Sequence, residues 1–75
     1  MVKDFMVADR DDNFYDIYIF KKDYKVEDIE EVVKNHKKEF VGEWTMESIE
    51  KAITNTFQVK EIIHCDFIKG NIMEV

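Results

Sequence analysis

Residues 14–20, FYDIYIF, decide the fold because they read as a β-strand with large apolar side chains on both of its faces. Alternation along a strand divides these side chains into two sets: Tyr15, Ile17 and Ile19, and Phe14, Tyr18 and Phe20. A chain of 75 residues lies near the size at which one hydrophobic core barely offsets the entropy lost on folding. Because so short a chain usually covers only one side of a sheet, the second apolar face needs an explanation.

Composition indicates a single globular domain spanning residues 1–75. The chain is 45% hydrophobic and 37% charged, which supplies enough apolar material for a core and argues against intrinsic disorder. Seventeen acidic residues against eleven basic ones give a formal net charge of -6. A negative field repels nucleic-acid phosphates and anionic membrane surfaces, so we expect neither nucleic acid nor a membrane as a partner.

The location that the sequence favours is the cytoplasm. The single cysteine, Cys65, cannot form an internal disulfide, and no stretch has the features of a secretion signal. No run approaches the roughly 20 apolar residues of a membrane span.

The two ends of the chain read as β-structure. Residues 2–8 and 14–20 flank the turn-forming cluster DRDDN at 9–13, which predicts a hairpin. Residues 59–68, VKEIIHCDFI, predict a third strand, and a turn at Gly70 and Asn71 would fold the last residues, IMEV, back as a short edge strand.

The middle of the chain has the period of two amphipathic helices. The first is expected at about residues 26–40 and ends near Gly42. Thr45 is expected to cap the second, from Met46 to about Thr56, and Trp44 with Ile49 has the spacing of a hydrophobic staple. The expected fold is therefore α+β, in the order ββααβ(β), with a small antiparallel sheet and two antiparallel helices packed on one face.

The charge of Asp16 suggests which face of the sheet the helices cover. Since a carboxylate favours solvent, the opposite side of the strand should meet the helices, together with matching residues of the other strands. This predicts a helix-covered face of Phe5, Val7, Tyr15, Ile17, Ile19, Ile63, Cys65 and Phe67. The predicted outward face, and the predicted interaction surface, consists of Met6, Phe14, Tyr18, Phe20, Ile62 and His64.

An exposed patch of this size has three explanations. The C-terminal strand, strand twist or a helix could cover it, a second copy of the chain could pack on it, or a different protein could bind it.

Candidate catalytic and metal-binding groups are few. His64 and Cys65 are adjacent and would point to opposite faces of a strand, and His36 fits the edge of the core. His64 and Asp66 share a face but lack a nucleophile and an oxyanion donor. Asp9, Asp11 and Asn13 match the start of a calcium loop, whereas Phe14 replaces its glycine and Phe20 its bidentate glutamate. We therefore expect no enzymatic activity, no metal and no cofactor.

The function that the sequence favours is a non-enzymatic protein–protein interaction or regulatory role, as a homodimer or with a protein partner bound on the outward sheet face. Small acidic proteins of phages and mobile elements are of this type. The alternative is an acidic mimic of nucleic acid that inhibits a basic DNA-binding protein through Glu27, Asp28, Glu30, Glu31, Glu47 and Glu50.

Overall fold

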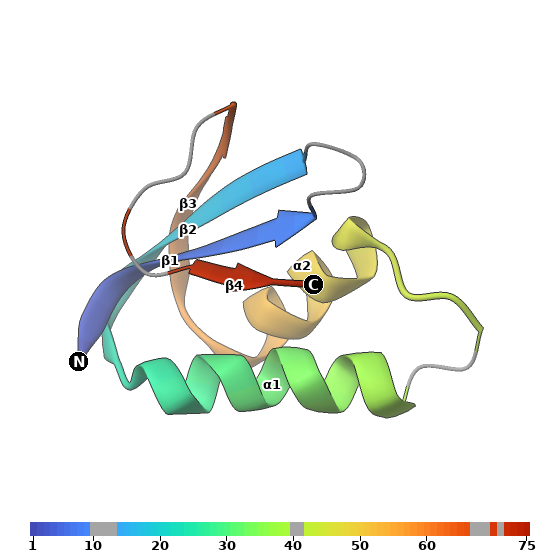
Figure 1. Ribbon diagram of the computed structural model, residues 1–75. Helices are drawn as coiled ribbons and strands as arrows, with labels where there is room; N and C mark the ends of the chain where they lie inside the picture. Colours follow the sequence, from blue (N-terminus) through green and yellow to red (C-terminus); the bar gives the residue numbers. More distant parts are fainter. Residues whose placement is uncertain (10–13, 40–41, 67–69, 71) are drawn as a thin grey trace.

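The computed structural model of the chain describes residues 1–9, 14–39, 42–66, 70 and 72–75. The elements follow one another as β1 (Val2–Asp9), β2 (Phe14–Tyr24), α1 (Val26–Glu39), α2 (Met46–Thr56), β3 (Val59–Cys65) and β4 (Ile72–Glu74) (Figure 1). This order confirms the predicted ββααβ(β) arrangement and its α+β class.

The strands form one sheet in the order β3-β2-β1-β4. As predicted, β1 with β2 and β2 with β3 are antiparallel. The prediction of a wholly antiparallel sheet is wrong, because β4 pairs with β1 in parallel and the sheet is mixed. The predicted short C-terminal edge strand is present as β4, at the edge opposite to β3.

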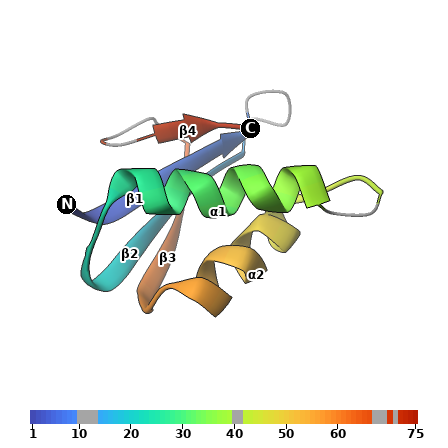
Figure 2. The ribbon, with the colours of Figure 1, turned by 90° about the horizontal axis from the view of Figure 1, so that it is seen from below.

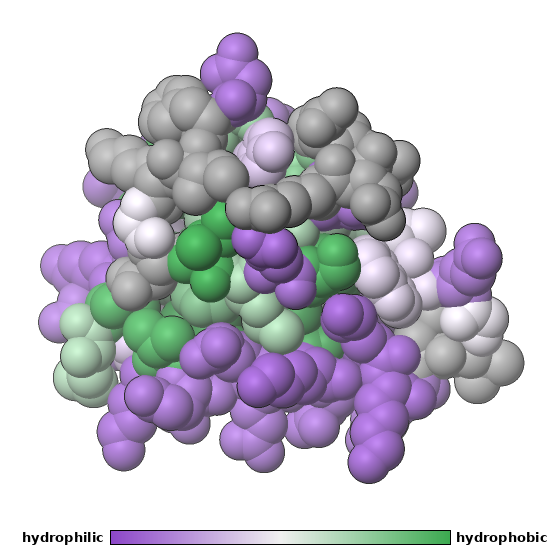
Figure 3. Space-filling view, in the orientation of Figure 1, coloured by the Kyte–Doolittle hydropathy of each residue, from purple (hydrophilic) through white to green (hydrophobic). Residues whose placement is uncertain are grey.

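Both helices lie on the same side of the sheet, and α2 runs back along α1 in roughly the opposite direction (Figure 2). The core between the two layers consists of buried residues from both: Phe5, Val7, Tyr18, Phe20, Ile29, Val33, Ile49, Ile53 and Phe57. Hydrophilic side chains cover the solvent side of α1, and hydrophobic residues gather between α1 and β4 (Figure 3). We call the sheet face away from the helices the outer face.

The start of α2 is fixed by a capping box. Thr45 Oγ1 accepts a hydrogen bond from Ser48 N at 3.1 Å, and Ser48 Oγ accepts one from Thr45 N at 2.9 Å. Predicting Thr45 as the N-cap was therefore correct. Ser48 Oγ also lies 2.8 Å from His36 Nε2 of α1, which ties the two helices together. The predicted end of α1 near residue 40 lies outside the described residues, as does the Asn71 part of the C-terminal turn.

The two faces of β2 are exchanged in the structure relative to the prediction. Asp16, Tyr18 and Phe20 face the helices, and Tyr15, Ile17 and Ile19 lie on the outer face. The register shows this directly, since Phe5 pairs with Tyr18. The prediction failed because it treated Asp16 as a solvated carboxylate, whereas Asp16 is only 2% exposed and is paired with His64.

The same reversal applies to the neighbouring strand. Ile63 and Cys65 were predicted on the helix-covered face and lie instead on the outer face, where they pair with Ile17 and Tyr15. Phe5 and Val7 were assigned correctly. Phe67 lies outside the described residues.

Candidate functional site

The outer face carries a continuous apolar patch on β2 and β3. Tyr15 and Cys65 pair across the two strands, Ile17 pairs with Ile63, and Ile19 extends the row along β2. All five side chains are partly or largely accessible, and Ile63 is 37% exposed. We call these five residues the outer apolar patch.

The β1 side of the outer face is closed, in contrast to the β2 and β3 side. Met6 and Ala8 lie on this face, because they pair with Ile17 and Tyr15, yet both are 0% exposed. β4 lies beside β1 and extends the sheet, so the C-terminal strand does not cover the outer apolar patch. A hollow of about 100 Å³ is lined by Ile17, Ile19 and Ile63 together with residues of β1.

The strand register places three acidic residues on the outer face. Asp4 and Glu61 both pair with Ile19, and Glu74 pairs with Ala8. All three carboxylates are exposed, as is Asp66 just beyond β3. The outer apolar patch therefore has an anionic border.

The residues predicted to form the interaction surface are divided between the two faces of the sheet. Met6 lies on the outer face but is fully buried. Tyr18 and Phe20 belong to the core, where they are 0% and 2% exposed, and Ile62 packs against it. The predicted outward orientation of Tyr18, Phe20 and Ile62 was wrong for the reason given for Asp16, whereas that of Met6 was correct. Phe14 and His64 also lie on the helix side, and both are exposed there.

His64 and Asp16 form the most distinctive polar contact of the structure. Cross-strand register places them opposite each other on β3 and β2, and His64 Nδ1 contacts Asp16 Oδ1. The Asp16 side chain is 3% exposed, whereas that of His64 is 67% exposed. Because a carboxylate oxygen only accepts, Nδ1 of His64 carries a proton and donates to Asp16. The Phe14 ring lies edge-on to the imidazole, with 5.8 Å between ring centroids.

The hydroxyl of Tyr18 is a buried polar group near Asp16. It makes no hydrogen bond with any described residue. Burial raises the pKa of Tyr18 well above its ordinary value, and the nearby charges of Asp16 and Glu50 raise it further. The hydroxyl is therefore neutral and close to two carboxylates.

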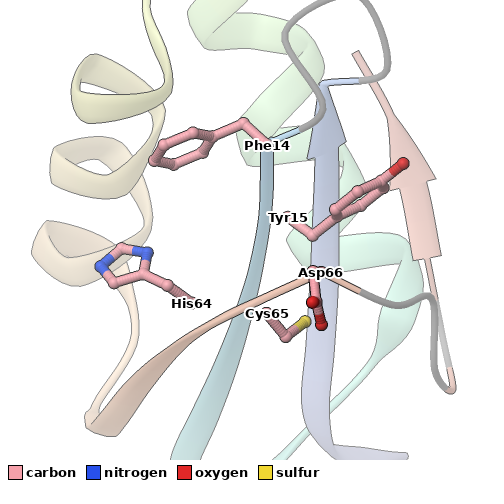
Figure 4. Close-up of a pocket in the computed structure, with 5 residues that line it drawn as sticks. All are labelled: Phe14, Tyr15, His64, Cys65 and Asp66. Atoms are coloured by element: carbon pink, nitrogen blue, oxygen red, sulfur yellow. The ribbon is translucent and has the colours of Figure 1, made fainter.

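Two adjoining hollows surround the exposed imidazole. The first, of about 200 Å³, lies between the sheet and α2 and is lined by Phe14, Asp16, Met46, Glu47, Glu50 and His64. We call it the acidic hollow. The second, of about 480 Å³, is lined by Phe14, Tyr15, His64, Cys65 and Asp66. In Figure 4, Phe14 and His64 point toward α2, while Tyr15, Cys65 and Asp66 lie on the other side of the strands, so the second hollow bends around the sheet edge.

The chemistry of this arrangement is that of an oriented imidazole. A carboxylate that holds Nδ1–H leaves Nε2 able to accept a proton, as in a catalytic dyad. The neighbouring hydroxyl of Tyr18 is a weak nucleophile because its pKa is raised, and Cys65 points to the other face. Among the described residues, no three His, Cys, Asp or Glu side chains are grouped to hold a metal ion. Asp11 and Asn13, which match the start of a calcium loop only in part, lie outside the described part of the chain.

Sequence reasoning missed the Asp16–His64 pair because it matched His64 with Asp66 on the same strand. The partner of His64 is decided by the register between β2 and β3, which cannot be read from the sequence. A signal was nevertheless present, since a charged residue flanked by Phe14 and Tyr18 at alternate positions is typical of a buried, partnered carboxylate.

Comparison with known proteins found no match to a protein family, to a curated protein or to a solved structure. Among the described residues, no helix is long and apolar enough to cross a membrane.

Proposed function

We propose that this chain is a non-enzymatic interaction protein that binds another protein through the outer apolar patch. The supporting observation is the partly exposed row of Tyr15, Ile17, Ile19, Ile63 and Cys65 on a sheet face that neither helix covers. Contiguous apolar surface on a soluble protein commonly marks a binding site. The interaction surface is still the outer face of the sheet, but it is formed by other residues than those predicted from the sequence. We place this function in the cytoplasm, because one cysteine offers no internal disulfide.

The border of the patch favours a basic partner over a second copy of the chain. Asp4, Glu61 and Glu74 lie on the outer face, and each chain carries a net charge of -6. Packing two copies face to face brings like charges together, whereas a partner with an apolar centre and a rim of lysine or arginine complements both features.

The test compares partner capture by the purified chain and by an outer-face variant. The double variant Ile17→Ser and Ile63→Ser removes the centre of the patch and should weaken binding about tenfold, the effect typical of losing central interface residues. The partner is first captured from lysate of the source cells and purified. Its binding to the wild type and to the variant is then measured by titration. Val32→Ser, a smaller apolar loss at a partly buried position of α1, is the control away from the outer face and should bind as the wild type does.

Salt distinguishes the proposal from mimicry of nucleic acid. Binding centred on the patch should fall only modestly between about 0.05 and 0.3 M NaCl, because the apolar contact is not screened. Steep loss with salt, together with full binding by the Ile17→Ser and Ile63→Ser variant, would contradict the proposal. That result would assign binding to the carboxylates of the helices.

A further inference from the structure

We propose that the partner binds through an extended segment that pairs with β3 and adds a fifth strand to the sheet. The segment lies on the side of β3 that faces away from β2, which we call the β3 edge. The inference rests on the proposed function, since the segment belongs to the protein that covers the outer apolar patch. It makes the main chain of residues 61–64 a binding element beside the side chains of the patch.

The sheet has two edges, and they differ in length. In the order β3-β2-β1-β4, β2 is the only described strand that pairs with β3, and β1 is the only one that pairs with β4. β4 has three residues, whereas β3 has seven. A very short edge strand offers few main-chain groups to another chain, which is one way in which natural proteins protect an edge. β3 lacks this protection.

Other protective features of β3 are confined to its start. The pairing with β2 skips Lys60, which is the extra residue of a bulge. Bulges and lysines both discourage pairing with a further strand. From Glu61 to His64 the ladder with β2 is regular, and this stretch contains neither proline nor lysine. It is therefore the part of the edge that can accept a strand.

The main chain at the β3 edge determines the class of the occupant. In an antiparallel pair, the N–H and C=O groups of alternate residues point away from the partner strand. Among the described residues, the main chain of residues 61–64 has hydrogen-bond partners on β2 alone. An extended backbone carries donors and acceptors at the matching spacing and binds such an edge by strand addition. A helix does not, because its main-chain groups are paired internally.

The side chains beside the edge determine the composition of that segment. On the outer face, Ile63 belongs to the outer apolar patch, and Glu61 lies two residues before it on the same face. A neighbouring strand extends the patch where it places an apolar residue beside Ile63, and it pairs favourably with Glu61 where it places a lysine. The segment is thus apolar at its centre and basic at its ends.

The helix side of β3 favours the same composition. His64 points toward α2 and Cys65 to the other side, so side chains of a neighbouring strand lie alternately toward α2 and toward the patch (Figure 4). Ile62 on the helix side is half-buried. The acidic hollow, which His64 also lines, contributes two carboxylates of α2 on this side.

A second copy of the chain fits the β3 edge less well than a basic segment. Each chain carries a net charge of -6, so pairing two β3 edges brings two acidic molecules together. A segment with lysine or arginine complements the same charge.

The experiment titrates the protein with the peptide acetyl-TKVIVKT-amide and follows the backbone amides by NMR. The peptide reads the same in both directions, so parallel and antiparallel addition present the same side chains to β3. Before addition, alternate amides of residues 61–64 should exchange rapidly with solvent, because they point outward. The peptide should produce saturable shifts in β3 and slow the exchange of these amides about fivefold or more near saturation.

Two N-methylated peptides test the main-chain contact. One carries N-methyl groups on both valines, and the other carries them on the isoleucine and both lysines, so each blocks one edge of the peptide strand. One of the two should bind as the parent peptide does, and the other about tenfold more weakly, because it loses main-chain hydrogen bonds to β3.

A pair of protein variants tests the position of the peptide. Glu61→Lys places a lysine beside the β3 edge and should weaken binding of the parent peptide about two- to fivefold. Glu27→Lys, the same charge reversal on the exposed side of α1, is the matched control and should bind as the wild type does. Dispersed amide signals show that each variant is folded.

Four results would overturn the inference. They are slow exchange of every amide of residues 61–64 without peptide, which would mean that the chain itself or a second copy covers the edge; no saturable shift in β3; equal binding of the two N-methylated peptides; or equal weakening by the two variants. Because the probe is a peptide, the result does not depend on the partner. Failure of the peptide with capture that needs the patch would reject strand addition alone, and capture that is insensitive to the patch would reject the proposed function alone.

Discussion

The core contains a polar atom, the hydroxyl oxygen of Tyr18, that has no hydrogen-bond partner among the described residues. The hydroxyl is buried, and the ring that carries it contributes to the central core. An unsatisfied buried donor costs about 1–3 kcal/mol. We therefore expect Tyr18→Phe to raise the free energy of unfolding by about 1 kcal/mol, measured by urea denaturation. The matched control is Tyr24→Phe, which removes a hydroxyl that accepts from Gln58 N at 2.9 Å and should destabilise the protein. A Tyr18→Phe protein less stable than the wild type would contradict this assignment.

The same residue predicts a loss of stability in alkali. A tyrosine in the unfolded chain ionises at about pH 10, while the folded protein keeps Tyr18 protonated because burial and the charges of Asp16 and Glu50 raise its pKa. Unfolding then releases a proton. The contribution is present below about pH 10 and is lost as the pH rises above it, at up to about 1.4 kcal/mol per pH unit. Unfolding free energies at several pH values should fall less steeply in Tyr18→Phe, and equal slopes would contradict the shift.

At the scale of the element, the hydrogen bonds of Ser48 join two helices at one atom. Its hydroxyl donates to Thr45 O at 2.8 Å and accepts from Thr45 N, which leaves one lone pair. His36 Nε2, 2.8 Å away, must therefore be the donor. Ser48 thus caps α2 and also holds the last turn of α1.

We expect Ser48→Ala to lower the free energy of unfolding by about 1–2 kcal/mol, because it removes half of the capping box and leaves His36 without this partner. Thr54→Ala is the matched control on the same helix, since the Thr54 hydroxyl is exposed and makes one long bond of 3.3 Å to Lys51 O. Denaturation midpoints of the two variants compare them. Equal losses would show that neither the cap nor the link from Ser48 to His36 stabilises the protein measurably.

Elements were easier to predict from the sequence than the faces they present. Both helices and the β1–β2 hairpin follow from periodicity, and the Thr45 cap follows from its position. The orientation of β2 does not, because its two faces are nearly equally apolar and the choice depended on Asp16. Only cross-strand register shows that His64 partners this carboxylate. The candidate patch was therefore predicted on the correct layer and assigned the wrong residues.

At the scale of the molecule, the position of β4 could not be predicted because three residues of strand carry almost no pairing information. β4 joins the edge beside β1, which leaves β3 as the other edge. A Cβ added to Gly70 would lie 3.9 Å from Asp4 Oδ1, which places the approach to β4 near the acidic border of the outer face. On the outer face of this sheet, Met6 and Ala8 of β1 are buried, whereas the outer apolar patch of β2 and β3 is partly accessible.

This balance of apolar centre and acidic border predicts the oligomeric state. The wild type should have the 9.0 kDa mass of one chain in light scattering at low salt, because two outer faces repel each other. Neutralising Asp4 and Glu61 by Asp4→Asn and Glu61→Gln should raise the apparent mass toward that of a dimer. The same charge change on α1, Glu27→Gln with Glu31→Gln, should leave it unchanged. A wild-type dimer that Ile17→Ser with Ile63→Ser dissociates would show that the patch binds a second copy, because its apolar contact would then outweigh the repulsion between the carboxylates.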